Sequence, residues 1–179
     1  MNPNKTIKAF DEWLVQHDLE FEAVVIGGSA LSLLGVIERH TQDVDVLEPD
    51  LPAEIAESAR AFAEHFRDED GELDDDWLNS GPRSLAKELP VGWRERVRPL
   101  FAGEALRLST LGRSDLLHTK LFALCDRGLD LQDCIALRPS PEELAQCRPW
   151  VSARDAHEGW PAHVAEVFTD LARRLGHGL

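Results

Sequence analysis

The feature that most constrains the fold is a short apolar run, residues 21–26, that ends at the paired glycines Gly27 and Gly28. Its β-branched and apolar residues predict a buried strand, and the glycines predict a tight turn whose backbone N–H groups a ligand can approach closely. Residues 30–34 follow as a short predicted helix, so the turn lies at a positive helix end that suits a triphosphate. The Ser29 hydroxyl either contacts a phosphate or caps this helix.

A second predicted strand carries two acids. Asp43, Val44, Asp45 and Val46 alternate strictly, which is the period of a strand with one polar and one buried face. Asp43 and Asp45 therefore share one surface, where their like charges repel and raise a pKa unless a cation, a lysine or solvent lies between them. A divalent ion is the natural candidate. We expect Asp43 and Asp45 to bind Mg²⁺, or Mn²⁺, because magnesium takes one or two carboxylates plus substrate phosphates.

The remaining pattern predicts a mixed sheet first and helices second. The predicted helices are residues 5–17, a helix from Pro52 to Phe66, one from Ser114 to Gly128 with Ser114 as its cap, one from a capping box at Ser140, and one from Pro161. Residues 96–101 and 105–110 predict a hairpin, residues 68–76 predict a mobile acidic loop, and Pro149 should end or kink its helix. The expected fold class is α/β (α+β). A single domain is expected, with a sheet-containing core over residues 1–112 and helices over 113–179 packed on it.

Composition narrows the classes of partner. The chain has 179 residues, the size of one domain. Its formal charge of −14 disfavours nonspecific binding to the phosphates of nucleic acid. Any polynucleotide partner would need a local basic face. One stretch is a candidate for such a face, although a solvated mixed surface is the simpler interpretation: Arg83, Lys87, Arg94, Arg96, Arg98, Arg107 and Arg113. No segment has the length and apolarity of a membrane span, no secretory signal is evident, and a cytoplasmic location with three reduced core cysteines is expected.

The order and spacing of these motifs carry a resemblance. Gly27-Gly28-Ser29, followed by the run from Arg39 to Val46 that contains His40, Thr41 and Gln42, resembles the signature of the nucleotidyltransferase superfamily in its minimal bacterial form. The similarity to an uncharacterised family of nucleotidyltransferase-like proteins extends over residues 92–96, 109–117, 120–121, 127, 130–133, 140–144 and 150. It implies transfer of a nucleotidyl group from a nucleoside triphosphate to a hydroxyl of RNA, protein or a small molecule. It also implies that Gly27, Gly28, Ser29 and Thr41 bind the substrate.

A more distant resemblance concerns the second half of the chain. The sequence is similar to the abortive-infection toxins of type IV toxin–antitoxin systems, some of which transfer nucleotides to RNA, and this implies an antitoxin-like partner. Their pattern of lysine, arginine and aspartate matches Lys120, Arg127, and Asp130 or Asp133. Lys120 would then be catalytic, with Arg127 and Asp130 binding the substrate. Alternatively, Lys120 and Arg127, which share one helical face, pair with the two aspartates in a structural ion cluster.

The resemblance does not identify a third carboxylate, which active members of the superfamily place on a later strand. Four acids could substitute, although no pattern supports any of them: Asp74, Asp75, Asp76 and Glu104. The alternative is therefore an inactive domain that keeps the fold to bind a nucleotide or a protein, or two acids that only decorate an exposed strand. Three further side chains have both a site interpretation and a simpler one as surface or core residues: His40, His118 and Trp93.

Overall fold

The computed structural model describes residues 2–38, 41, 43–68 and 71–177. The chain divides into two compact units. The first contains the described residues up to Glu88 together with Arg94–Leu111, and the second contains Leu89–Trp93 and the chain from Gly112 onward. The expectation that the sheet-containing and helical halves form one domain stays a prediction.

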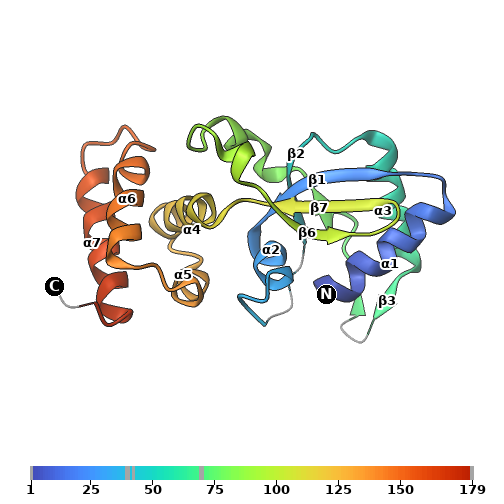
Figure 1. Cartoon of the computed structure of the whole chain (residues 1–179), viewed down its shortest axis with the longest axis horizontal. Helices are drawn as coiled ribbons and strands as arrows, with labels where there is room; N and C mark the ends of the chain where they lie inside the picture. Colours follow the sequence, from blue (N-terminus) through green and yellow to red (C-terminus); the bar gives the residue numbers. More distant parts are fainter. Residues whose placement is uncertain (1, 39–40, 42, 69–70, 178–179) are drawn as a thin grey trace. The chain divides into compact units, whose positions relative to one another are not determined.

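A five-stranded mixed sheet forms the centre of the first unit (Figure 1). Its strands are β1 (Phe21–Ile26), β2 (Val44–Glu48), β5 (Leu78–Asn79), β6 (Arg98–Ala102) and β7 (Leu106–Thr110), in the order β5-β2-β1-β7-β6. The pairs β1–β7 and β2–β5 are parallel, whereas β1–β2 and β6–β7 are antiparallel. The predicted α/β class and the predicted hairpin, now β6 and β7, are both confirmed.

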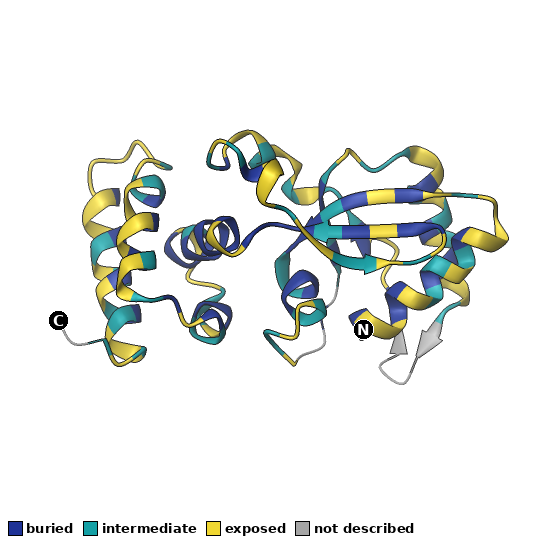
Figure 2. Cartoon of the chain, in the orientation of Figure 1, coloured by how far each residue is buried: buried dark blue, intermediate teal, exposed yellow. Residues whose placement is uncertain are grey.

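Three helices belong to this unit: α1 (Pro3–Gln16), α2 (Gly27–Leu33) and α3 (Ala53–His65). Phe10 of α1 and Phe62 of α3 are buried together with Trp77, and the ring centroids of Phe10 and Trp77 lie 5.1 Å apart, edge to face. Buried and exposed residues alternate along β1 and β7 (Figure 2). The sheet therefore buries one face in this aromatic and aliphatic core and turns the intervening side chains to the other face.

Two short 3-10 helices and a small second sheet complete the first part of the chain. They are η1 (Gly81–Lys87), η2 (Trp93–Arg96), and the antiparallel pair β3 (Arg67–Asp68) and β4 (Gly71–Glu72). The pair β3–β4 lies in the segment predicted as a loop, which is a correction to the prediction for its backbone. Leu73, the only apolar residue of that segment, is buried.

The second unit contains four helices, α4 (Arg113–Arg127), α5 (Leu131–Leu137), α6 (Pro141–Ser152) and α7 (Trp160–Arg174). The capping box at Ser140 is confirmed: its hydroxyl accepts from the Glu143 N–H, and the Glu143 carboxylate accepts from the Ser140 N–H. Burial raises the pKa of the Cys125 thiol to about 11 and those of Cys134 and Cys147 to about 12. These three thiols are free and buried, as predicted.

Several predicted helix ends were wrong. Helix α3 has Pro52 as its N-cap rather than as its first residue, and α4 has Gly112 rather than Ser114 as its N-cap. Helix α6 continues past Pro149 to Ser152, so the proline does not end it. Pro149 removes one backbone donor, but the following turn is closed by the Ala153 N–H, which donates to the carbonyl oxygens of Pro149 and Trp150. Among the described residues, no helix has both the length and the apolarity to cross a membrane.

Candidate active site

The glycine turn and the acidic strand border the same place in the first unit. Strands β1 and β2 pair in antiparallel register with Ile26 opposite Asp45, so Gly27 follows directly beside the second acid. The φ angle of Gly27 is +83°, and a Cβ atom added there would overlap Oδ2 of Asp45. Only glycine meets both conditions without strain, since a left-handed backbone is costly for other residues. The carboxylate of Asp45 therefore packs against the backbone of the turn.

The first acid lies one residue before β2. Val44 and Val46 are completely buried, whereas Asp43 and Asp45 are only partly buried. This alternation indicates that the two acids share the face opposite the core, as the sequence predicts. Helix α2 begins at Gly27, and the first N–H groups of any helix have no partner within it. Gly27 and Gly28 thus contribute backbone donors in the first turn, next to Asp45.

Two predicted substrate-binding residues have a positioning role in the structure. The Ser29 hydroxyl donates to the backbone carbonyl of Asp43 and lies 2.8 Å from the Thr41 hydroxyl. Because a hydroxyl has one hydrogen, Thr41 must be the donor in the second bond. Ser29 is 1% exposed and is the third residue of α2 rather than its cap, so the capping alternative was wrong. The pair holds the start of β2 against α2, and direct contact of Ser29 or Thr41 with a substrate stays a prediction.

A third acid acts on this site. Burial, and after it the negative charge of Asp76, raises the pKa of Asp43 above its ordinary value. The cause is the parallel pairing of β2 with β5: the Val44 N–H donates to the carbonyl oxygen of Trp77, and Val44 pairs with Leu78. This register brings the exposed residue Asp76 to the start of β2. The sequence contained no usable signal for it, because β5 has only two residues and its partner is more than thirty residues away.

The donor set agrees with the chemistry of magnesium. Among the residues that the structure describes, no group of three or more His, Cys, Asp or Glu side chains is close enough to form a metal site on its own. Magnesium commonly takes one or two carboxylates and completes its shell with water and phosphate oxygens. Asp43 and Asp45 supply such oxygens, and a bound cation would favour the charged form of Asp43, whose pKa is raised by burial and by the charge of Asp76. The residues therefore fit a magnesium ion that a substrate helps to bind.

The other predicted site residues lie in the second unit. The Lys120 ammonium donates to Asp130 at 3.0 Å and to Asp133 at 2.8 Å, and its side chain is 8% exposed. Arg127 lies 4.0 Å from Asp130 and is 60% exposed. This is the structural ion cluster that the sequence left open as an alternative. Catalysis by Lys120 and substrate binding by Arg127 and Asp130 stay predictions.

The comparison with known protein families decides what this glycine turn and its acids belong to. A family model described as "Nucleotidyltransferase of unknown function (DUF6036)" matches residues 5–137, which include the turn, Asp43, Asp45 and Lys120. The chain belongs to this nucleotidyltransferase family. The match ends at the last residue of α5, so α6 and α7 lie outside it. No curated protein and no solved structure matches the chain.

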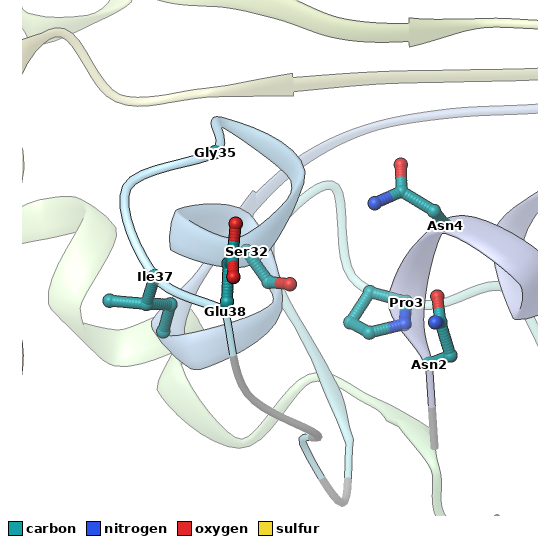
Figure 3. A pocket seen from close by; sticks show the side chains of 7 residues that line it. All are labelled: Asn2, Pro3, Asn4, Ser32, Gly35, Ile37 and Glu38. Carbon is teal, nitrogen blue, oxygen red and sulfur yellow. The ribbon is translucent and has the colours of Figure 1, made fainter.

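One hollow of the first unit lies at the C-terminal end of α2, opposite the glycine turn at its start (Figure 3). It has a volume of about 380 Å³, and its side chains come from the start of α1, from α2 and from the segment after α2. It is lined by Asn2, Pro3, Asn4, Ser32, Gly35, Ile37 and Glu38. None of these residues was predicted to be functional. Among the residues that the structure describes, this lining offers one carboxylate and no cationic side chain to the phosphates of a nucleotide.

Two of the three side chains that could belong to either the site or the core lie within the described residues. His40, like its neighbours Arg39 and Gln42, lies outside the described residues. The His118 Nδ1–H donates to the carbonyl oxygen of Ser114 at 2.7 Å, and its ring packs edge-on against Trp150. Trp93 is 3% exposed. His118 and Trp93 are therefore packed residues, and Trp93 presents little ring surface on which a base could stack.

Proposed function

We propose that the protein transfers a nucleotidyl group from a nucleoside triphosphate to a hydroxyl of an RNA, protein or small-molecule acceptor. The observation that carries this proposal is the contact of the Asp45 carboxylate with the backbone of Gly27, because it places the acidic strand beside the glycine turn that we expect to bind phosphate. Membership of the nucleotidyltransferase family supports a nucleotide substrate.

Each residue has an assigned part. Asp43 and Asp45 would hold Mg²⁺ or Mn²⁺, which offsets the negative charge that develops on the phosphoryl oxygens. The backbone N–H groups of Gly27 and Gly28 would bind the triphosphate. Ser29 and Thr41 keep the start of β2 in position through their hydroxyl pair.

The reaction balances without a further reagent. The acceptor hydroxyl oxygen forms a bond to the α-phosphorus, the bond from that phosphorus to the leaving oxygen breaks, and pyrophosphate departs. We assign the hydroxyl proton to Asp76, because its negative charge acts on Asp43 and its side chain is exposed to solvent. Asp76 would thereby take the role of the third carboxylate, for which the sequence alone could not distinguish it from Asp74, Asp75 and Glu104.

The test is label transfer from each of the four α-³²P-labelled nucleoside triphosphates in the presence of Mg²⁺, with cellular RNA and protein as acceptors. We expect labelling by the wild type, loss of at least about a hundredfold in Asp43→Asn, and a loss of about tenfold or more in Asp76→Asn. Asp75→Asn is the matched control: it removes the neighbouring exposed acid and should keep activity near that of the wild type. Absence of labelling by the wild type with every nucleotide would contradict the proposal.

A second function keeps the same site without turnover: the domain would bind a nucleotide or a protein partner. It rests on the sequence, in which no pattern distinguishes a third carboxylate among Asp74, Asp75, Asp76 and Glu104. Calorimetry separates the two functions. Binding of a nucleoside triphosphate without any label transfer would support the binding module.

The toxin-like version of the proposal concerns the second unit. Its acceptor would be RNA, its regulator an antitoxin-like protein, and its phosphate ligand Arg127, whose guanidinium is largely exposed. Expression of the wild type should then arrest growth of a bacterial host, whereas Asp43→Asn should not. Equal growth of the two cultures, at equal protein levels, would contradict this version while leaving transfer to other acceptors open to the labelling assay.

A further inference from the structure

A hollow lined mainly by donors lies beside the strand that carries Asp45. Helix η1 contributes Arg83, Ser84 and Lys87 to a hollow of about 340 Å³, and Asp50 is the fourth lining residue. Arg83 and Asp50 lie 4.0 Å apart, with side chains that are 65% and 77% exposed. An ion pair so open to water contributes little, so Arg83 retains most of its capacity to bind another anion.

The charge around this hollow contrasts with that of the chain as a whole. The chain has a formal charge of −14, yet residues 81–98 contain five basic residues and two acidic ones. Arg94 also neutralises the acid at the end of β2: its Nε lies 3.0 Å, and its Nη2 2.7 Å, from oxygens of Glu48. The lining of the hollow itself contains two cations, Arg83 and Lys87, and one acid, Asp50, so it is more positive than the chain as a whole, which favours an anionic ligand.

The hydrogen-bond donors of Arg83, Ser84 and Lys87 suit the several oxygens of a phosphate better than the two oxygens of a carboxylate. A planar guanidinium, an ammonium on a flexible stem and a hydroxyl together offer several N–H and O–H groups to the oxygens of one phosphate. All three side chains are exposed and come from one turn of chain, so they can adjust to the spacing of successive phosphates. Contacts from these three side chains to phosphate would depend on charge and not on the identity of the bases.

The position of the hollow indicates how many phosphates the ligand has. Strand β2 separates Asp45 from Glu48 by three residues, or about 10 Å at the usual rise of a strand. A single phosphate cannot contact both Asp45 and the hollow beyond Glu48. A chain of phosphodiesters can bind the hollow with one phosphate and extend toward Asp43 and Asp45.

We propose that Arg83, Ser84 and Lys87 bind the phosphodiester backbone of a single-stranded oligonucleotide, which is the acceptor of the nucleotidyl group. The role as acceptor rests on the proposed function, whereas the binding of the backbone does not. The same side chains have an affinity for the phosphates of a free nucleoside triphosphate, and the experiment separates these two sources.

Fluorescence anisotropy with a labelled RNA of about twelve nucleotides tests the proposal, with a DNA of the same sequence and a scrambled RNA as further probes. The double variant Arg83→Ala/Lys87→Ala should bind about tenfold or more weakly, and equally so for every sequence. Its salt dependence between about 50 and 200 mM should be shallower by roughly 1.4 in the slope of log K against log salt, since each contact to a single strand contributes about 0.7.

The control variant Lys8→Ala/Arg60→Ala removes the same charge from the exposed faces of α1 and α3 and should bind as the wild type does. Equal weakening in the two double variants would overturn the proposal, because it would show an effect of net charge alone. Absence of oligonucleotide binding by the wild type would overturn it as well. Displacement of the RNA by ATP or tripolyphosphate at equal phosphate concentration would assign the hollow to the free triphosphate instead.

The variant Asp43→Asn distinguishes this proposal from the proposed function. It should bind the oligonucleotide as tightly as the wild type while failing to transfer label. If the wild type transfers no label but its RNA binding still depends on Arg83 and Lys87, the proposed function fails and the backbone site stands. If label transfer occurs but Arg83→Ala/Lys87→Ala binds RNA normally, the backbone site fails and the proposed function stands.

Discussion

The two units of the protein use neighbouring carboxylates in opposite ways. In the second unit, Asp130 and Asp133 receive hydrogen bonds from the buried ammonium of Lys120, and Asp133 is 1% exposed. In the first unit, Asp43 is half-buried, and the two strongest influences on its pKa, burial and the charge of Asp76, both raise it. A buried lysine completes the first arrangement, whereas in the second both burial and a neighbouring acid disfavour the charged form of Asp43.

The difference teaches which cluster is structural and which has capacity for a ligand. Paired buried charges hold segments of chain together, and removal of one partner is costly. A carboxylate whose pKa is raised by burial and by a neighbouring acid carries a cost in its charged form that a bound cation can relieve. The ion cluster of Lys120 therefore connects α4 and α5 through paired charges, whereas a cation bound at Asp43 would offset the influences that raise its pKa.

Removal of the lysine should give the largest effect. Lys120→Met removes the ammonium that bonds the buried Asp133 and the partly buried Asp130, and we expect a loss of about 3–5 kcal/mol in the free energy of unfolding. Urea denaturation followed by circular dichroism measures it. Arg127→Met is the control, because the guanidinium is mostly exposed and only 4.0 Å from Asp130, and it should change stability little. Equal stability of Lys120→Met and the wild type would show that the cluster is not structural.

An intermediate effect is expected at the glycine turn. Gly27→Ala and Gly35→Ala both place a side chain on a left-handed backbone, with φ angles of +83° and +69°. Only the first also meets an obstacle, since a Cβ atom at Gly35 has nothing within 4 Å. Gly35→Ala should therefore cost about 1–2 kcal/mol for its backbone alone, and Gly27→Ala about 1–3 kcal/mol more for the displacement of Asp45.

The same pair of variants sharpens the functional argument. If the contact between Gly27 and Asp45 matters for nucleotidyl transfer, Gly27→Ala should lose label transfer at temperatures where it is still folded, and Gly35→Ala should retain it. Both free energies come from thermal or urea unfolding. Equal losses of stability in the two variants would mean that Asp45 moves aside without cost.

Local sequence patterns predicted the parts of the site that neighbouring residues determine. Residues 21–26 form β1 with the predicted bounds, because a short β-branched run before glycine has few alternatives. The two acids face away from the core because a period of two leaves Val44 and Val46 on its inner side. These features depend on a few consecutive side chains, so they could be predicted from the chain itself.

Features that depend on distant pairing could not be predicted in this way. Ser29 resembles a helix cap in the sequence, but its hydroxyl is captured by Thr41 and the carbonyl of Asp43. Asp76 lies among six other acids, and only the pairing of β5 with β2 distinguishes it. Lysine is usually a surface residue, and the burial of Lys120 depends on Asp130 and Asp133, which follow α4 and accept hydrogen bonds from its ammonium. In each case the contacts of the side chain come from residues distant in the sequence, which a local pattern does not reveal.

The smallest effect should come from neutralising Asp43, and its sign is opposite to that of the lysine variant. The folded protein raises the pKa of this carboxyl above its ordinary value of 3.8. Between these two values the folded state binds more protons than the unfolded state, so stability falls as the pH rises through that interval. Above the folded pKa the destabilisation is fully present. Asp43→Asn should therefore melt at a slightly higher temperature than the wild type at neutral pH, and the difference should shrink as the pH falls toward 3.8.

A divalent ion should make the wild type, and not Asp43→Asn, the protein with the higher melting temperature. If Asp43 and Asp45 bind Mg²⁺, the ion offsets the charge that raises the pKa of Asp43, and millimolar magnesium with a nucleoside triphosphate should raise the melting temperature of the wild type. Asp43→Asn should not respond, and Asp75→Asn should respond like the wild type. A wild type that is already more stable than Asp43→Asn at neutral pH without any ion would mean that Asp43 is held by a favourable internal contact. The contrast with the Lys120 cluster would then disappear, because both groups of acids would be structural.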